Sequence, residues 1–160
     1  MGSALVVDDD PVSRRVIAHL LERSGHTPMV AADGHAALAL LTSFRPAVVC
    51  VDLRMPGMDG IELVARMRAR LGDRMPHVVM LTASGDADDR LRADAAGVEH
   101  YLTKPIGSAA VAAVIEPLFA TPLTGQRAAG APTTAAGAAS TSAAHVVSMP
   151  VVAVAAGTAR

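Results

Sequence analysis

Short apolar runs alternate with longer segments of helical periodicity along residues 4–119, and no other feature constrains the fold as much. The runs are rich in valine and leucine and show little polar alternation, as is typical of strands covered on both faces. Parallel strands need crossover helices, and right-handed crossovers place helices on both faces of a sheet. We therefore expect an α/β domain with a doubly wound five-stranded parallel sheet of strand order 2-1-3-4-5. The expected strands are Ala4–Val7, Pro28–Ala31, Ala47–Val51, His77–Leu81 and His100–Leu102.

The helical segments carry their own start and stop signals. The first is expected over Pro11–Ser24, because Asp10 is a suitable N-cap, Pro11 suits the first helical position and Gly25 suits the end. Its apolar residues are expected to stack on one side: Val12, Val16, Leu20, Ile17 and Leu21. The other helices are expected over His35–Ser43, Gly60–Leu71, about 88–96 and Ser108–Phe119, the last with Ser108 as N-cap and Pro117 near its end.

The composition changes near residue 120. Residues 121–160 contain no acidic residue and two arginines, and they are rich in Ala, Gly, Thr, Ser and Pro. Such a composition predicts a low-complexity, disordered tail or linker. We therefore expect one folded domain over residues 1–120, followed by this tail over 121–160.

Charge and hydropathy exclude several classes of protein. A net charge of −1 gives no field that indicates binding to nucleic acid or to an anionic membrane. No apolar run reaches the ~20 residues that span a bilayer, and no basic segment precedes the first run as in a signal peptide. We expect a cytoplasmic protein. The single cysteine, Cys50, allows no intrachain disulfide and is expected to be a buried thiol.

Polar side chains that can bind ligands or take part in catalysis follow four of the five predicted strands. Asp8 and Asp9 follow the first strand, and Asp10 after them is better explained as the helix N-cap. The other candidates are Asp52 after the third strand, Thr82 after the fourth and Lys104 after the fifth. In open α/β sheets, ligands bind beyond the carboxyl ends of the strands. We expect these acids, this hydroxyl and this amine to form one site.

Three carboxylates in one place predict a metal ion, because they repel one another unless a cation compensates them. Mg²⁺ takes one or two carboxylates, keeps several waters and leaves positions for phosphate oxygens, so Asp8, Asp9 and Asp52 suit it. No Cys or His, the usual zinc ligands, stands at these strand ends. A carboxylate can also be a nucleophile in phosphoryl transfer, and Asp52, on the central strand, is the best candidate.

Four segments together resemble the receiver domain of two-component response regulators, of the chemotaxis type. They are Val7-Asp8-Asp9-Asp10-Pro11, the stretch Asp52-Leu53-Arg54-Met55-Pro56-Gly57-Met58-Asp59-Gly60, then Leu81-Thr82-Ala83, and Tyr101-Leu102-Thr103-Lys104-Pro105. The resemblance covers residues 4–119. It implies that Asp52 is the phosphoacceptor and that Asp8, Asp9, Asp52 and the backbone carbonyl of Arg54 bind Mg²⁺, for which Mn²⁺ can substitute. It also implies that Thr82 and Tyr101 form a switch pair, that Lys104 contacts the phosphoryl group and that the peptide bond before Pro105 is a cis candidate.

Two positions depart from the commonest family pattern. Arg54 lies two residues beyond Asp52, where an uncharged or amide side chain is also common, and Ser84 lies two residues beyond Thr82. Both border the path of attacking water. We expect them to tune the lifetime of the phosphorylated state, in a direction that the sequence does not give.

The leading functional hypothesis is a phosphorylation-dependent switch fed by a sensor histidine kinase or a phosphotransfer protein. It would catalyse its own phosphorylation and dephosphorylation without being an enzyme in the usual sense. Its downstream partner would bind the face of the fourth helix, fifth strand and fifth helix, with no direct nucleic acid contact and no membrane. The alternatives are a constitutive docking module and a haloacid dehalogenase-type phosphatase, but the phosphatase needs an Asp where Arg54 stands. A stand-alone regulator and a piece of a larger or hybrid protein both remain open.

Overall fold

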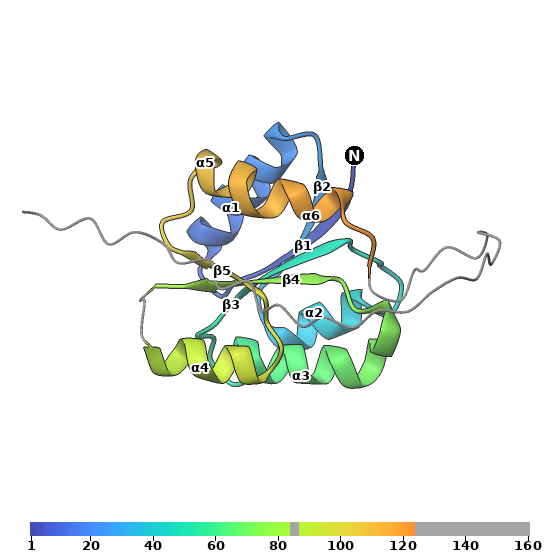
Figure 1. Ribbon diagram of the computed structural model, residues 1–160, viewed down its shortest axis with the longest axis vertical. Coiled ribbons are helices and arrows are strands. Elements are labelled where there is room, and N and C mark those ends of the chain that lie inside the picture. Colours follow the sequence, from blue (N-terminus) through green and yellow to red (C-terminus); the bar gives the residue numbers. More distant parts are fainter. Residues whose placement is uncertain (84–86, 124–160) are drawn as a thin grey trace, which may run out of the picture. The chain divides into compact units, whose positions relative to one another are not determined.

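The computed structural model describes residues 1–83 and 87–123, which contain the expected alternation of strands and helices (Figure 1). Five parallel strands form one sheet in the order β2-β1-β3-β4-β5, so the predicted fold class is confirmed. The strands are β1 (Ser3–Val7), β2 (Thr27–Ala31), β3 (Val48–Asp52), β4 (His77–Thr82) and β5 (His100–Thr103). Ser84 and residues 124–160 of the predicted tail lie outside the described residues.

Helices cover both faces of the sheet (Figure 1). One face carries α1 (Pro11–Arg23), α5 (Ser108–Ala110), a π-helical turn η2 (Val111–Ile115) and α6 (Glu116–Ala120). The other face carries α2 (Gly34–Leu40), α3 (Gly60–Leu71), the short 3₁₀ turn η1 (Gly72–Arg74) and α4 (Ala87–Ala95). None of the described helices is long and apolar enough to cross a membrane.

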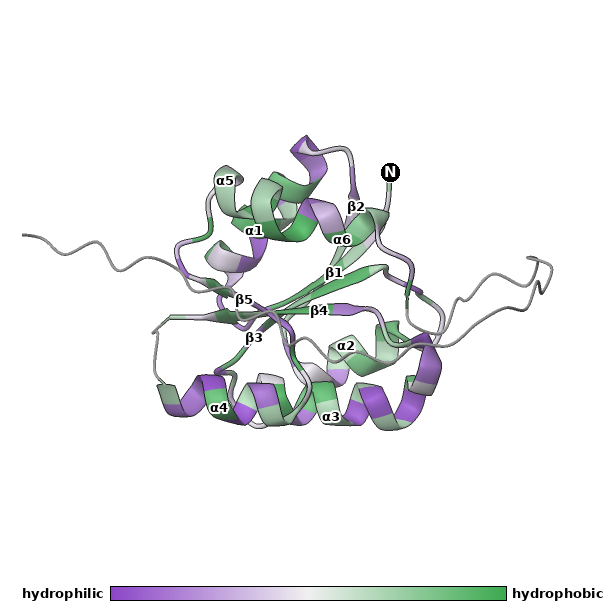
Figure 2. Ribbon diagram, viewed as in Figure 1, coloured by the Kyte–Doolittle hydropathy of each residue, from purple (hydrophilic) through white to green (hydrophobic). Residues whose placement is uncertain are grey.

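The core consists of two apolar clusters, one on each face of the sheet. Successive strand residues point to opposite faces, so Val49 and Val51 pack toward α2 and α3 while Val48 and Cys50 pack toward α1 and the C-terminal helices. All five residues of β3 are buried. Figure 2 shows the hydrophobic colouring along β1 and β3 that this double coverage requires. The central strands are therefore packed on both faces, and this packing fixes the positions of the residues that follow their carboxyl ends.

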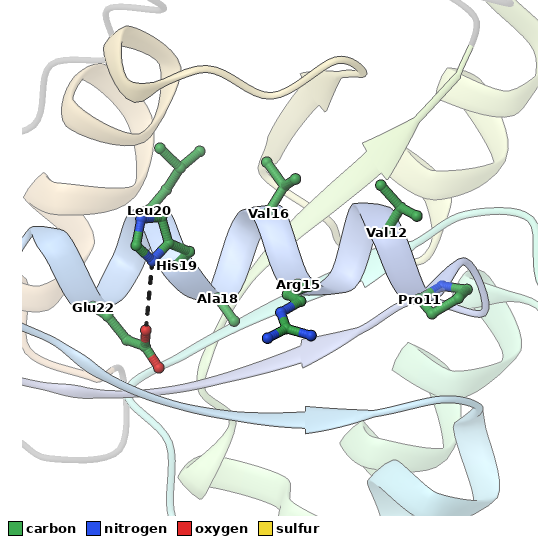
Figure 3. A pocket seen from close by; sticks show the side chains of 8 residues that line it. All are labelled: Pro11, Val12, Arg15, Val16, Ala18, His19, Leu20 and Glu22. Atoms are coloured by element: carbon green, nitrogen blue, oxygen red, sulfur yellow. Dashed lines mark ion pairs between the residues drawn. The ribbon is translucent and has the colours of Figure 1, made fainter.

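The first helix begins as predicted but buries only part of its apolar set. Asp10 caps it by accepting hydrogen bonds from the backbone N–H groups of Val12 and Ser13. Ile17 is buried, whereas Val12 is 70% and Val16 46% exposed. Figure 3 shows the side chains of Val12, Val16 and Leu20 on the same side of α1. The expectation that all these residues share one side was wrong, because each residue turns the helix by about 100° and residues 12 and 17 lie on different faces.

The C-terminal helix also differs from its prediction. Ser108 is the first helical residue rather than the N-cap, which is Gly107, and no side chain caps this end. The helix then widens into a π turn, in which the N–H of Glu116 donates to the carbonyl of Val111. Pro117 explains this widening, because it has no N–H to donate and its ring would collide with the carbonyl four residues earlier in a regular α-helix.

Candidate functional site

The carboxyl ends of β1, β3, β4 and β5 meet at one edge of the sheet, as the sequence predicts. Asp52 ends β3 and pairs in register with Leu81, and Thr82 ends β4 beside Thr103. Lys104 follows β5, and its N–H donates to the carbonyl of Thr82 at 2.8 Å. The ladder hydrogen bonds therefore fix the depth at which each functional residue leaves the sheet.

Three carboxylates gather at this edge. One oxygen each from Asp8, Asp9 and Asp52 can be chosen so that all lie within 4.8 Å of one another. Asp8 is fully buried and Asp52 nearly so, whereas Asp9 is exposed. This set offers only oxygen donors, one of them open to solvent, and such a set fits a hard divalent cation. The cluster can hold a metal ion.

Asp8 is held in a fixed orientation. Its Oδ1 accepts a hydrogen bond from the N–H of Asp10 at 2.9 Å, and its Oδ2 accepts one from the hydroxyl of Ser13 at 2.7 Å. Arg14 donates to the backbone carbonyl of the same residue at 2.6 Å. Sequence reasoning missed Ser13 and Arg14, whose only signal was their place in the first turn after the acidic run. These contacts position a carboxylate that would otherwise be costly to bury.

Lys104 joins the acidic cluster. Its Nζ lies 2.7 Å from Oδ2 of Asp8 and 3.0 Å from Oδ1 of Asp52. Burial raises the pKa of Asp52, and the hydrogen bond from Lys104 opposes part of that rise. Burial lowers the pKa of Lys104, but hydrogen bonds to Asp8 and Asp52 outweigh it, and the net direction is upward. The lysine therefore provides a fixed positive charge beside the carboxylate of Asp52. The peptide bond that follows it, Lys104–Pro105, is cis.

A glycine places the loop after β3 close to the site. A Cβ on Gly60 would lie 2.4 Å from the backbone oxygen of Asp52, a distance that no real side chain adopts. The N–H of Gly60 donates to the carbonyl of Leu53 at 2.9 Å, and Asp59 caps α3 by accepting from the N–H of Glu62. The start of α3 is thus packed directly against the end of β3.

Tyr101 is turned toward α4. Its hydroxyl donates to Oδ1 of Asp94 at 2.5 Å and lies 3.0 Å from the carbonyl of Val98, and the guanidinium of Arg90 lies 5.1 Å from the ring centroid. Burial and the hydrogen bond to Asp94 raise the pKa of Tyr101. Thr82, its predicted partner in switching, is partly buried at the end of β4. Because Thr82 ends β4 and Tyr101 lies in β5, the two residues stand on neighbouring strands.

Arg54 makes a contact that the sequence did not indicate. Its guanidinium donates two hydrogen bonds to Oδ2 of Asp89, from Nε at 3.1 Å and from Nη2 at 2.6 Å. Asp89 lies in α4, 35 residues later, and no local signal connects the two positions.

The fold and the site define a class: a doubly wound domain with an acidic cluster and a lysine at the carboxyl edge of its sheet. Solved structures similar to it include the chemotaxis response regulator CheY4 of Vibrio cholerae, with a TM-score of 0.68 and 29% identity, covering 74% of this chain and 98% of that one. A putative response regulator from Chloroflexus aurantiacus has a TM-score of 0.70 and 28% identity, with coverage of 75% and 98%.

Residues 4–116 match the family model of the response regulator receiver domain. The chain belongs to this family and is a receiver domain of two-component signalling. It is 39% identical to the response regulator MprA of Mycolicibacterium vanbaalenii over 63% of this chain and 43% of that protein. It is 35% identical to the phosphate regulon transcriptional regulatory protein PhoB of Escherichia coli over 63% of this chain and 44% of that protein. The chain thus spans less than half the length of these two relatives.

Proposed function

We propose that this receiver domain is a switch that accepts a phosphoryl group on Asp52 from a histidine kinase or a phosphotransfer protein. The observation that carries the proposal is the position of the Asp52 carboxylate, which lies within 3.0 Å of the Lys104 ammonium and beside Asp8 and Asp9. In the same proposal Asp8, Asp9, Asp52 and the backbone carbonyl of Arg54 hold Mg²⁺, for which Mn²⁺ can substitute.

The chemistry follows from the charges. One oxygen of Asp52 attacks phosphorus, a bond from that oxygen to phosphorus forms, and the bond from phosphorus to the donor nitrogen breaks with its electrons moving to that nitrogen. Mg²⁺, when bound, neutralises charge on the transferring group. The Lys104 ammonium holds a phosphoryl oxygen, and the Thr82 hydroxyl donates to another. The buried Asp8 stays fixed by Ser13 and by the N–H of Asp10 throughout.

Phosphorylation replaces the single negative charge of the Asp52 carboxylate by the roughly two charges of a phosphoryl group, a net change of about −1, and adds three acceptor oxygens. We propose that Thr82 and Tyr101 respond to this change and alter the face formed by α4, β5 and the C-terminal helix. A downstream partner binds that face.

The test is incubation with acetyl phosphate and Mg²⁺, followed by intact mass measurement. We expect a mass gain of one phosphoryl group in the unaltered chain and in Asp33→Asn, a matched control at the exposed N-cap of α2. We expect no gain in Asp52→Asn or after chelation of the divalent cation. A gain that persists in Asp52→Asn would refute the assignment.

Two outcomes would indicate the alternative functions. If Asp52 stays unlabelled in a folded chain with Mg²⁺ bound, the domain is a constitutive docking module. Sustained hydrolysis of added phosphate esters would indicate a phosphatase. That function is disfavoured because the residue two positions beyond Asp52 is an arginine, which cannot serve as the general acid.

A further inference from the structure

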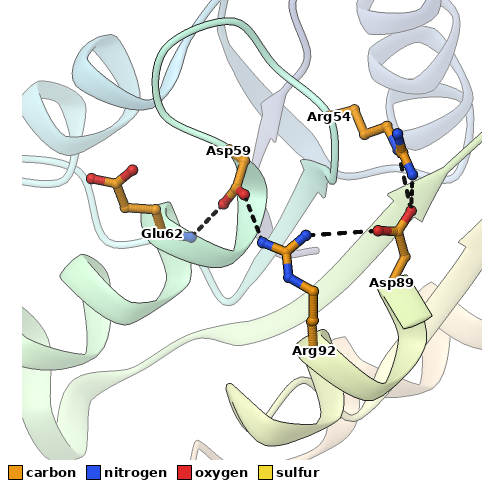
Figure 4. Close-up of polar contacts among 5 residues, drawn as sticks. All are labelled: Arg54, Asp59, Glu62, Asp89 and Arg92. Atoms are coloured by element: carbon orange, nitrogen blue, oxygen red, sulfur yellow. Dashed lines mark hydrogen bonds and ion pairs between the residues drawn. The ribbon is translucent and has the colours of Figure 1, made fainter.

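A chain of alternating charges joins α4 to the loop after β3 (Figure 4). The Arg54 guanidinium pairs with Asp89, which also lies 3.8 Å from Nη1 of Arg92. Nη2 of Arg92 lies 3.1 Å from Oδ2 of Asp59, and Oδ1 of Asp59 caps α3. The network therefore ties α4 to the loop between β3 and α3, which begins at the phosphoacceptor itself.

The helix α4 depends on these polar contacts more than its neighbours do. Only Asp89 and Ala93 are buried along it, whereas α3 buries a row of five residues. Leu91, the largest apolar side chain of α4, is 66% exposed. A buried carboxylate thus stands where an amphipathic helix usually places an apolar residue. Because Asp89 is only 7% exposed, it needs a cationic partner to offset its desolvation.

Arg54, in contrast, has a largely exposed side chain that lies close to the carboxyl edge of the sheet. Its side chain is 68% exposed, and its backbone lies two residues beyond Asp52. Nε and Nη2 of Arg54 both donate to one oxygen of Asp89, whereas in a bidentate pair each nitrogen donates to a different carboxylate oxygen. A phosphoryl group offers more charge and three oxygens in a geometry that arginine binds well.

We propose that Asp89 is a positioning residue that holds the Arg54 guanidinium on α4 and competes for it with the phosphoryl group on Asp52. The inference rests on the proposed function and deepens it. Without phosphate, Arg54 stays on Asp89 and α4 is tied to the loop after β3. With phosphate, Arg54 turns to the phosphoryl oxygens and its link to Asp89 is lost, while the Arg92–Asp59 pair remains. With one of its two links to the loop gone, the N-terminal part of α4 opens more readily.

Binding of beryllofluoride, a mimic of the aspartyl phosphate, tests the competition. Calorimetric titration of the full chain in Mg²⁺ gives the affinity of the mimic. Asp89→Asn removes the competing charge with little change of shape, and we expect it to bind the mimic about five- to tenfold more tightly. Asp59→Asn is the matched control: it removes the same charge one link further along and leaves the Arg54–Asp89 pair in place, so we expect less than about a twofold change.

The Arg54→Gln background isolates the interaction. If Asp89 acts through Arg54, adding Asp89→Asn to Arg54→Gln leaves the affinity unchanged. An equal gain in affinity in both backgrounds would show a general electrostatic effect and would overturn the proposal. No gain in affinity from Asp89→Asn alone would also overturn it. If the unaltered chain does not bind the mimic, the proposed function fails and the competition fails with it. If it binds and only the Asp89 effect is missing, the competition alone fails.

Hydrogen exchange provides a second measurement that does not depend on the fold of the Asp89 variant. Arg54→Gln changes an exposed side chain and is expected to fold. In the unaltered chain, addition of the mimic is expected to speed exchange of the amides in 87–95, because the Arg54–Asp89 link is lost. In Arg54→Gln this segment is expected to exchange rapidly before addition and to change little afterwards. Slower exchange at α4 in the unaltered chain on binding would contradict the proposal.

Discussion

Lys104 is the single lysine of the chain, and its ammonium lies between two buried carboxylates. Without it, Asp8 and Asp52 would face each other with no fixed cation between them. We expect Lys104→Met to lower the free energy of unfolding at neutral pH by about 2–4 kcal/mol when no divalent cation is present. Because Mg²⁺ can supply the missing charge, thermal unfolding should show a larger stabilisation by Mg²⁺ in this variant than in the unaltered chain.

Arg66→Met is the matched control for that experiment. Arg66 pairs with Glu62 along the exposed face of α3, with both side chains about half exposed. Such a pair contributes about 0.3–0.5 kcal/mol, and its loss should leave the response to Mg²⁺ unchanged. Equal stabilisation of Lys104→Met and the unaltered chain by Mg²⁺ would mean that the lysine and the metal do not compensate the same charges.

Cys50 is enclosed in the central strand, and burial raises the pKa of its thiol to about 12. Because the thiolate is the reactive form, a disulfide reagent at pH 8 should not modify the native chain but should modify it fully in denaturant. The unfolded thiol ionises near its ordinary pKa of 9.0 while the folded one does not. Its contribution to stability is therefore lost progressively as pH rises from 9 toward 12. Cys50→Ala should remove this part of the alkaline decline, and rapid modification of the native chain would disprove the enclosure.

At the scale of elements, one histidine joins α6 to the turn before β2. Nε2 of His26 lies 2.9 Å from Oε2 of Glu116, and its ring stacks on Phe119 with centroids 3.6 Å apart. The N–H of Gly2 lies 3.2 Å from Nδ1 of His26, an arrangement that places the ring proton on Nε2. The residue that precedes β1, the turn before β2 and α6 are thus joined through His26.

This contact predicts a dependence of stability on acid. The hydrogen bond with His26 lowers the pKa of Glu116, so the folded state favours the carboxylate. The stabilisation is present above the ordinary value of 4.5 and is lost as pH falls through the lower folded value. Glu116→Gln should lower the free energy of unfolding by up to about 1 kcal/mol at neutral pH. The stability of this variant should also fall less than that of the unaltered chain when the pH is lowered. The exposed Glu99→Gln is the control, and an identical acid profile for Glu116→Gln would refute the coupling.

The elements also show where sequence reasoning succeeds. Strands buried on both faces and helices with clear caps follow from local patterns, so β3 and α3 match their predictions within a residue. The π turn before Pro117 was not predicted, because the proline signals a disturbance but not which turn absorbs it. The pairs of Asp89 with Arg54 and of Glu116 with His26 join residues 35 and 90 positions apart. Only the assembled fold brings such residues together, and a buried acid in α4 resembles an ordinary exposed one in the sequence.

At the scale of the whole molecule, both apolar clusters and the entire site lie within residues 4–118. The matched family region ends at residue 116, close to the boundary predicted from composition. We expect a fragment of residues 1–123 to contain everything that folding and phosphorylation require. Its unfolding midpoint should lie within about 2 °C of the full chain, since about 1 kcal/mol shifts the midpoint of a domain of this size by several degrees. Labelling of Asp52 by acetyl phosphate should proceed at the same rate in both. A much less stable or poorly labelled fragment would show that residues 124–160 take part in the domain.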